Sequence, residues 1–324
     1  MSIEQIIQTK RIHLLFLLPF ILAGIIAGYR YLGESTHACS EEGIIALPFL
    51  DKYHDTQWLF WLGALWLLLL SYLLFFIADR HRELSRTTVL PAFIYLILSA
   101  GLFCRHGLNA YAIAAAPVAL AIDRLQLIIT RLNSNAPVFD FGLLIAITVL
   151  LCPKLALLLP WAILVLPFSG RSTLKDMMAL LLGFVTVLLF IVAYFFLFDN
   201  LETVRDRIMN ALHAGEWPDY RFHPLEWVAI ALLVAVSLAT MTHALTRTLY
   251  EAVSRRREIL AMISLSFFLG STFLLIPLPG HTFLFVLFVP LSYLYAHYFA
   301  SYRRRYVGRL LLLALLTASM LMIL

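Results

Sequence analysis

The sequence predicts an all-α, polytopic integral membrane protein, and three observations support this. Of the 324 residues, 62% are hydrophobic and only 13% are charged, whereas soluble domains are about half apolar and about a quarter charged. The apolar residues form successive runs near the length that an α-helix needs to cross a bilayer, about 17–25 residues. These runs do not alternate residue by residue as the strands of a membrane barrel do. The spans are therefore expected to be helical.

Eleven apolar runs are the expected membrane helices, in a single transmembrane domain that covers residues 1–324. The first run follows Lys10 and Arg11 and is too long for the apolar core of a signal peptide, so we expect a retained helix. The eleven expected spans are 13–32, 57–78, 89–104, 109–123, 138–152, 154–169, 177–198, 226–245, 260–277, 281–299 and 309–324.

The loop charges predict the orientation of these helices. With the N-terminus inside, 17 of the 24 Lys and Arg residues fall on the inner side, as the positive-inside rule requires. The chain is therefore predicted to have its N-terminus inside and its C-terminus outside. The net charge of +5 reflects these basic inner loops, so it does not indicate nucleic-acid binding.

Two outer loops are expected, over 33–56 and 199–225. The first is acidic and includes Asp51 and Asp55. If this loop folds back onto the membrane, either aspartate can act as a general base beside a phosphate leaving group. The alternative is an acidic loop that is simply solvated. His37, Cys39 and His54 lack a standard ligand spacing, so no metal site is predicted.

Two of the expected hairpins are short and have cationic tips. Their helices have about 14–16 residues and are about 21–24 Å long, whereas the hydrocarbon core is about 30 Å thick. We therefore expect both tips to stop short of the outer surface, or the bilayer to thin beside them. The first tip carries Arg105 and His106, and the second carries Lys154.

Together with Arg30 at the outer end of the first helix, these cations can frame one phosphate or pyrophosphate group. The alternative for Lys154 is a lysine that caps the hairpin and extends its amine to the interface. Cys104 and Cys152 are near the same tips. They are either one disulfide or two buried apolar side chains.

Few charged residues are expected within the membrane. Asp123 and Arg124 are placed at the inner end of the fourth span, where they can pair. Asp140 and Asp176 are at inner helix starts, where a carboxylate complements the helix dipole. This scarcity argues against an ion-coupled transporter.

The middle of the chain resembles an uncharacterised family of polytopic inner-membrane proteins from Bacteroidota. The segments that carry the resemblance are HRELSRTTVLPAFIYLILSAG, FDFGLLIAITVLLCPKLALLLPWAILVLPF and GRSTLKDMMALLLGFVTVLLFIVAYFFLFD. This family supplies no established activity.

The hairpin GLLIAITVLLCPK is also similar to a hairpin of GT-C-type glycosyltransferases, with Lys154 near the lysine of that family. The similarity implies a polyprenyl-phosphate sugar donor and a catalytic acid in the first outer loop. The acidic pair that those enzymes carry after the first helix has only Glu41–Glu42 as a loose counterpart, and their large soluble domain has no counterpart.

The leading hypothesis is therefore a protein of GT-C-like architecture that engages a polyprenyl-phosphate-linked glycan at its outer face. In it, Lys154, Arg105, His106 and Arg30 hold the phosphate, and Asp51 or Asp55 is the base. The rival is a non-enzymatic subunit that scaffolds an envelope glycan or protein-export complex. The expected partners are membrane lipid and other inner-membrane envelope proteins.

Overall fold

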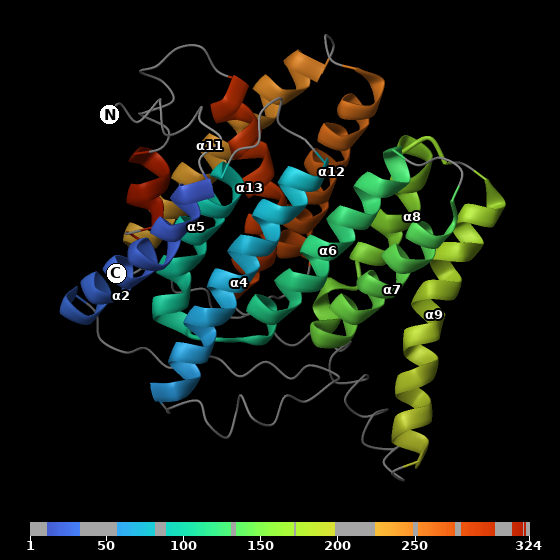
Figure 1. Cartoon of the computed structure of the whole chain (residues 1–324), viewed down its shortest axis with the longest axis horizontal. Coiled ribbons are helices and arrows are strands. Elements are labelled where there is room, and N and C mark those ends of the chain that lie inside the picture. Colours follow the sequence, from blue (N-terminus) through green and yellow to red (C-terminus); the bar gives the residue numbers. More distant parts are fainter. Residues whose placement is uncertain are drawn as a thin grey trace.

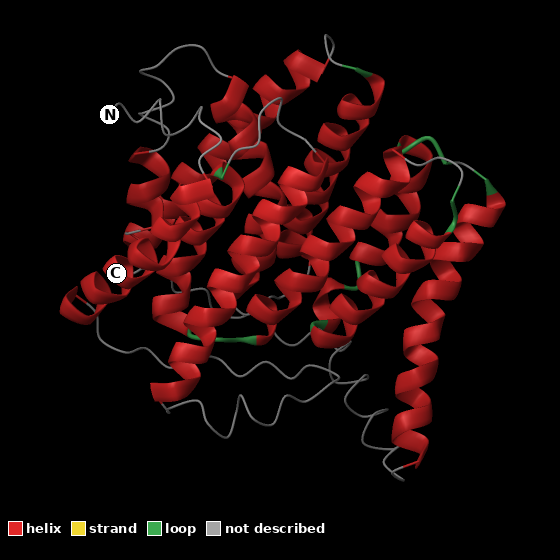
Figure 2. Ribbon diagram, viewed as in Figure 1, coloured by secondary structure: helices red, strands yellow, loops and turns green. Residues whose placement is uncertain are grey.

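The computed structural model describes most of the membrane domain. The described residues are 12–32, 57–81, 89–130, 134–171, 173–197, 224–248, 252–275, 280–301, 313–319 and 321. Within them all regular secondary structure is helical (Figure 2), which confirms the predicted all-α class. The expected outer loops 33–56 and 199–225 lie outside the described residues, except that α11 already begins at Pro224.

Each expected span coincides with helical residues in the described part of the chain. The named elements are η1 (Ile12–Leu17), α2 (Leu18–Leu32), α4 (Gln57–His81), α5 (Leu90–His106), α6 (Ala110–Thr130), α7 (Ala136–Leu151), η2 (Pro153–Leu155), α8 (Leu158–Phe168), α9 (Leu174–Leu197), α11 (Pro224–Thr248), α12 (Val253–Leu275), η3 (Gly280–Phe283) and α13 (Leu284–Ser301).

Two helices are longer at the polar end than the apolar pattern predicts. α6 continues seven residues beyond the expected end at Asp123, because that carboxylate is paired inside the bundle and does not have to reach water. α12 begins at Val253, seven residues early, so the run Arg255–Arg257 is helical. Charged residues therefore do not mark the end of α6 or the start of α12.

The core of the bundle is built by α5, α6 and α13, with α13 packed against both α5 and α6. Most residues of α5 and α6 are buried, and Tyr111 of α6 meets Phe283 of η3 edge-on at 6.2 Å. α4 covers this core on one side, and α7, α8 and α9 form the other flank, with α9 outermost (Figure 1).

Four described helices are long and apolar enough to cross a membrane unaided: Trp58–His81, Ala110–Thr130, Leu174–Leu197 and Trp227–Thr246. α9 is the clearest case, because only Asp176, Leu180 and Gly183 of its 24 residues are buried. Its other large apolar side chains are exposed or partly exposed. Water would not favour so extended an apolar surface, which indicates a membrane protein.

The two ends of the bundle differ in chemistry. At one end, ion pairs and hydrogen bonds join the last turn of α4, the second half of α6, the start of α7, the α8–α9 turn and the start of α12. We call this the arginine-rich end, after Arg80, Arg124, Arg171, Arg255 and Arg257. The α5–α6 turn and η2 lie at the opposite end, which we call the hairpin end. These two ends correspond to the expected inner and outer sides.

Candidate functional site

Lys154 lies at the tip of the α7–α8 hairpin, in the 3₁₀ element η2, which is one turn long. Pro153 lacks an amide hydrogen and disfavours a helical conformation in the residue before it. Cys152 is accordingly extended, with φ −137° and ψ 90°. Cys152, Pro153 and Leu155 are buried, and Lys154 between them is only partly exposed. The backbone thus holds the lysine close to the protein surface.

Arg105 and His106 form the last two residues of α5, and both are partly exposed. Gly107 ends the helix with a φ of 63°, a conformation that glycine adopts without steric cost. Asn109 begins α6, where its side-chain oxygen accepts a hydrogen bond from the amide of Ala112 at 2.8 Å. This side chain is the N-cap of α6.

The α5–α6 tip is recessed from the end of the neighbouring α4. A Cβ placed on Gly63 would lie 3.0 Å from the Cβ of Leu108, so Gly63 is level with the turn. The indole of Trp66 donates to the Ala112 carbonyl at 2.9 Å, one turn further in. Because α4 extends six residues beyond Gly63 to Gln57, it continues for about 9 Å past the tip.

The α7–α8 tip is recessed in the same way from the end of α9. α7 and α9 cross at Gly142 and Gly183, where each glycine lies against the backbone of the other helix. Both helices start at the arginine-rich end. From the crossing, α7 continues for nine residues and α9 for fourteen, so α9 extends about 7 Å further. The projecting end of α9 is visible in Figure 1.

The predicted cations are thus found at two tips of the same end, with different neighbours. η2 packs against α7 and α12, whereas the α5–α6 hairpin packs against η3. Asp51 and Asp55 lie outside the described residues, and so does the side chain of Arg30 in the last turn of α2. Cys104 and Cys152 are buried thiols, not a disulfide. Among the described residues, no three His, Cys, Asp or Glu side chains are grouped as a metal site.

A charge network around the buried Asp123 at the arginine-rich end is larger than the sequence indicated. Asp123 of α6 is almost fully buried, and one of its carboxylate oxygens lies 2.7 Å from Nε2 of His81. The other oxygen lies 3.4 Å from Arg80 and 3.9 Å from Arg124. Arg124 also reaches Asp140 of α7 at 3.4 Å. The network therefore joins α4, α6 and α7, and its two carboxylates balance its two guanidinium groups.

A second buried ion pair fixes the α8–α9 turn. Arg171 and Asp176 are each 4% exposed, and they are joined at 2.9 Å. Arg171 also donates to the Asn135 side chain at 3.2 Å and to the Ser134 carbonyl at 2.6 Å. Asp176 is therefore more than the helix-start residue that the sequence predicted, because it neutralises an arginine from the preceding turn.

Sequence reasoning missed His81, Arg80 and Arg171 as partners of these carboxylates. All three follow or precede apolar runs, so they read as ordinary loop cations. One feature of the sequence could have indicated this pairing. Arg80, Asp123 and Asp140 are all expected on the same side of the membrane, at the ends of neighbouring spans.

Gln126, one turn beyond Asp123, is completely buried. Neither its Nε2 nor its Oε1 has a hydrogen-bond partner among the described residues. We expect Gln126→Met to raise the free energy of unfolding by about 1–3 kcal/mol, because the buried amide is removed at similar volume. The measurement is thermal unfolding in a Cys39→Ser background, followed by a thiol-reactive dye that labels the buried Cys104 and Cys152 on unfolding.

The matched control for Gln126→Met is Ser99→Ala, which removes a buried hydroxyl that donates to the Tyr95 carbonyl at 2.6 Å. This control should not stabilise the protein. A Gln126→Met variant with a lower unfolding midpoint than the parent would contradict the prediction and indicate that the amide is satisfied by a bound water.

The comparison with family models gives one match. A model described as a family of unknown function, DUF6427, matches residues 43–324. The chain belongs to this family. The DUF6427 region includes both hairpin tips, the two buried ion-pair networks and the expected bases Asp51 and Asp55, while α2 with Arg30 precedes it. No curated protein matches the chain, and no solved structure matches it.

Proposed function

We propose that this DUF6427 protein binds a polyprenyl-phosphate-linked glycan at the outer face of a bacterial inner membrane. Lys154, Arg105 and His106 hold the phosphate, with Arg30 as a further cation. The observation that carries the proposal is the recess of the two cationic hairpin tips behind the ends of α4 and α9.

The recess determines what kind of anion these side chains meet. If the ends of α4 and α9 lie at the outer membrane surface, tips about 7–9 Å further in lie at the boundary between headgroups and hydrocarbon. At that depth the phosphate of a lipid is the anion within reach. Ammonium and guanidinium groups are strong hydrogen-bond donors to phosphate oxygens, and a partly buried lysine is less screened than a solvated one.

The similarity of the α7–α8 hairpin to that of GT-C-type enzymes extends the proposal to glycosyl transfer. Asp51 or Asp55 removes the proton of an acceptor hydroxyl. The hydroxyl oxygen then attacks the anomeric carbon, and the polyprenyl phosphate leaves with the electrons of the broken carbon–oxygen bond. The cations at the tips stabilise the charge of the leaving phosphate.

The test is native mass spectrometry of the gently purified protein. The wild type is expected to retain a polyprenyl phosphate, and Lys154→Ala is expected to lower its occupancy about tenfold, the effect of losing one charge-assisted hydrogen bond. Lys175→Ala is the matched control, because Lys175 is an exposed lysine at the start of α9, at the opposite end. Equal occupancy in all three proteins, or bulk phospholipid alone, would contradict the proposal.

The second candidate function is a non-enzymatic subunit of an envelope glycan or protein-export complex. The exposed apolar length of α9 favours it, since such a helix offers a partner helix a long lateral surface. A stoichiometric second polypeptide in the wild-type spectrum, with no polyprenyl phosphate, would favour this function over the first.

A further inference from the structure

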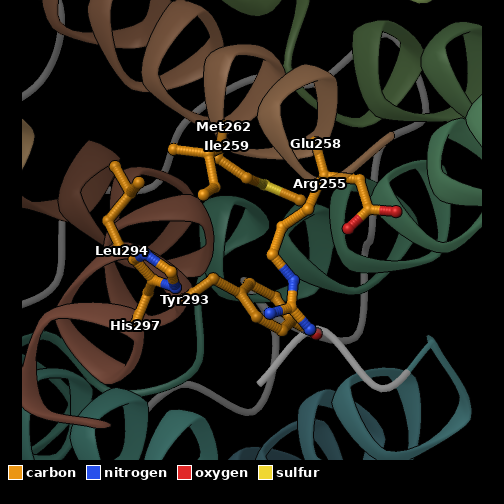
Figure 3. A pocket seen from close by; sticks show the side chains of 7 residues that line it. All are labelled: Arg255, Glu258, Ile259, Met262, Tyr293, Leu294 and His297. Atoms are coloured by element: carbon orange, nitrogen blue, oxygen red, sulfur yellow. The ribbon is translucent and has the colours of Figure 1, made fainter. Parts of the chain in front are cut away.

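A small cavity lies between α12 and α13, towards the arginine-rich end (Figure 3). Its volume is about 30 Å³. A water molecule needs about 10–15 Å³ on the same measure, so the space fits two waters or the oxygens of one phosphate group and excludes a sugar or a nucleotide. The lining residues are Arg255, Glu258, Ile259 and Met262 of α12, and Tyr293, Leu294 and His297 of α13.

The lining is mainly apolar, and its polar groups belong to Arg255, Glu258, Tyr293 and His297. Ile259, Met262 and Leu294 are buried. The partly buried Arg255 extends from α12 towards Tyr293 of α13, and the imidazole of His297 lies on the opposite side of the cavity (Figure 3). The Tyr293 side chain is held in place by α4, because its hydroxyl donates a hydrogen bond to the Leu74 carbonyl at 3.1 Å.

The three consecutive arginines of α12 have three different environments. Arg257 donates to the Ser169 carbonyl at 3.3 Å, and its guanidinium lies against Gly170, which ties α12 to the α8–α9 turn. Arg256 is exposed. Arg255 alone of the three lines the cavity. A run that reads as a uniform basic stretch thus supplies one structural arginine, one surface arginine and one arginine at a cavity.

Glu258 is the one acidic residue in the lining, and it bears on which ligand the cavity takes. Its carboxylate points away from His297 (Figure 3), so the ligand position that we consider is the part of the cavity between Arg255 and His297. Arginine has five N–H donors and can contact an anion while it keeps another partner.

We propose that this cavity binds the phosphate group of an anionic phospholipid, held by Arg255 and His297, with the glycerol and acyl chains outside the cavity. Basic pockets between membrane helices on the cytoplasmic side are a recurrent setting for such headgroups. The cavity is at the opposite end from the hairpin tips, so this inference stands independently of the proposed glycan site.

The test is lipid titration of the full-length, delipidated protein in a neutral detergent, read by native mass spectrometry. The probes are phosphatidylglycerol and the zwitterionic phosphatidylcholine. The wild type is expected to bind phosphatidylglycerol in preference. Arg255→Gln is expected to weaken that binding about tenfold, and His297→Gln to weaken it as well.

Arg256→Gln is the matched control, since it removes the same charge from the adjacent residue without touching the cavity. It should change the affinity less than about twofold, as expected of a screened surface charge. Lys154→Ala should leave this binding unchanged, which separates the inference from the proposed function. The thermal unfolding midpoint of each variant verifies that it is folded.

Three outcomes would overturn the proposal. If Arg255→Gln and Arg256→Gln weaken phosphatidylglycerol binding equally, the binding depends on general surface charge and not on the cavity. Equal binding of phosphatidylcholine would remove the requirement for an anion. A thermal shift with millimolar inorganic phosphate that depends on Arg255, without retention of phosphatidylglycerol, would replace the lipid by free phosphate.

Discussion

Gly142→Ala is expected to destabilise the protein, although alanine normally stabilises a helix relative to glycine. A Cβ at Gly142 would overlap the Leu180 carbonyl of α9, and one at Gly183 would overlap the Phe139 carbonyl of α7. Small residues at such a crossing allow two membrane helices to approach closely. The added methyl group forces the backbones apart, at a cost of about 1–3 kcal/mol.

The effect should concentrate on α9, because its few buried residues lie in the first ten positions of the helix. Thiol-dye unfolding gives the stability change, and limited proteolysis of the α8–α9 turn reports the release of α9. Gly270→Ala is the control, since nothing lies within 4 Å of a Cβ at that helical position. If Gly142→Ala behaves like Gly270→Ala, the close crossing does not hold α9 in place.

Asp176→Ala should be more damaging still, with a loss of about 3–5 kcal/mol in the free energy of unfolding. Removal of the carboxylate leaves the guanidinium of Arg171 buried without the counter-charge that lies 2.9 Å away. The Asn135 and Ser134 oxygens still accept hydrogen bonds from Arg171, but neither carries a charge. The unfolding midpoint in neutral detergent measures the loss.

A double variant separates the cost of an unpaired buried charge from the cost of lost packing at Asp176. Arg171→Met with Asp176→Leu replaces both charges by apolar side chains, and it should recover much of the stability lost in Asp176→Ala, as apolar replacement of buried pairs often does. Lys175→Ala, a change at an exposed neighbour, should be close to neutral. A double variant as unstable as Asp176→Ala would mean that packing at Asp176, not the buried charge, sets the cost.

Local residue chemistry predicted much of the fold. Apolar run lengths located the helices and the two hairpin turns between them. Those turns contain Pro153, whose ring restricts the backbone, and Gly107, which adopts a positive φ without steric cost. The sequence also predicted four short hairpin helices, and this was wrong for α6, which has 21 residues. The positions of Gly63 and Gly183 show a recess of the tips relative to α4 and α9, while their depth relative to the outer membrane surface stays a prediction.

The buried polar contacts were not predictable in the same way. Asp123 read as a helix end because a carboxylate in a membrane helix is costly, and the sequence does not show that His81, 42 residues earlier, lies 2.7 Å away. The cavity at Arg255 was hidden for a similar reason. It depends on which of three consecutive arginines faces α13. Consecutive residues of a helix point about 100° apart, so the run alone does not identify that arginine.

The unequal helix lengths have a consequence for the bilayer itself. α7 has 16 residues and spans about 24 Å, whereas α9 beside it has 24 residues and spans about 36 Å. A hydrocarbon layer of about 30 Å cannot match both. A recessed hairpin tip or a locally thinner bilayer accommodates α7, and a tilt accommodates α9, so we expect hydrophobic mismatch to vary around the perimeter of the protein. We therefore expect the stability of the protein to depend on the thickness of the bilayer.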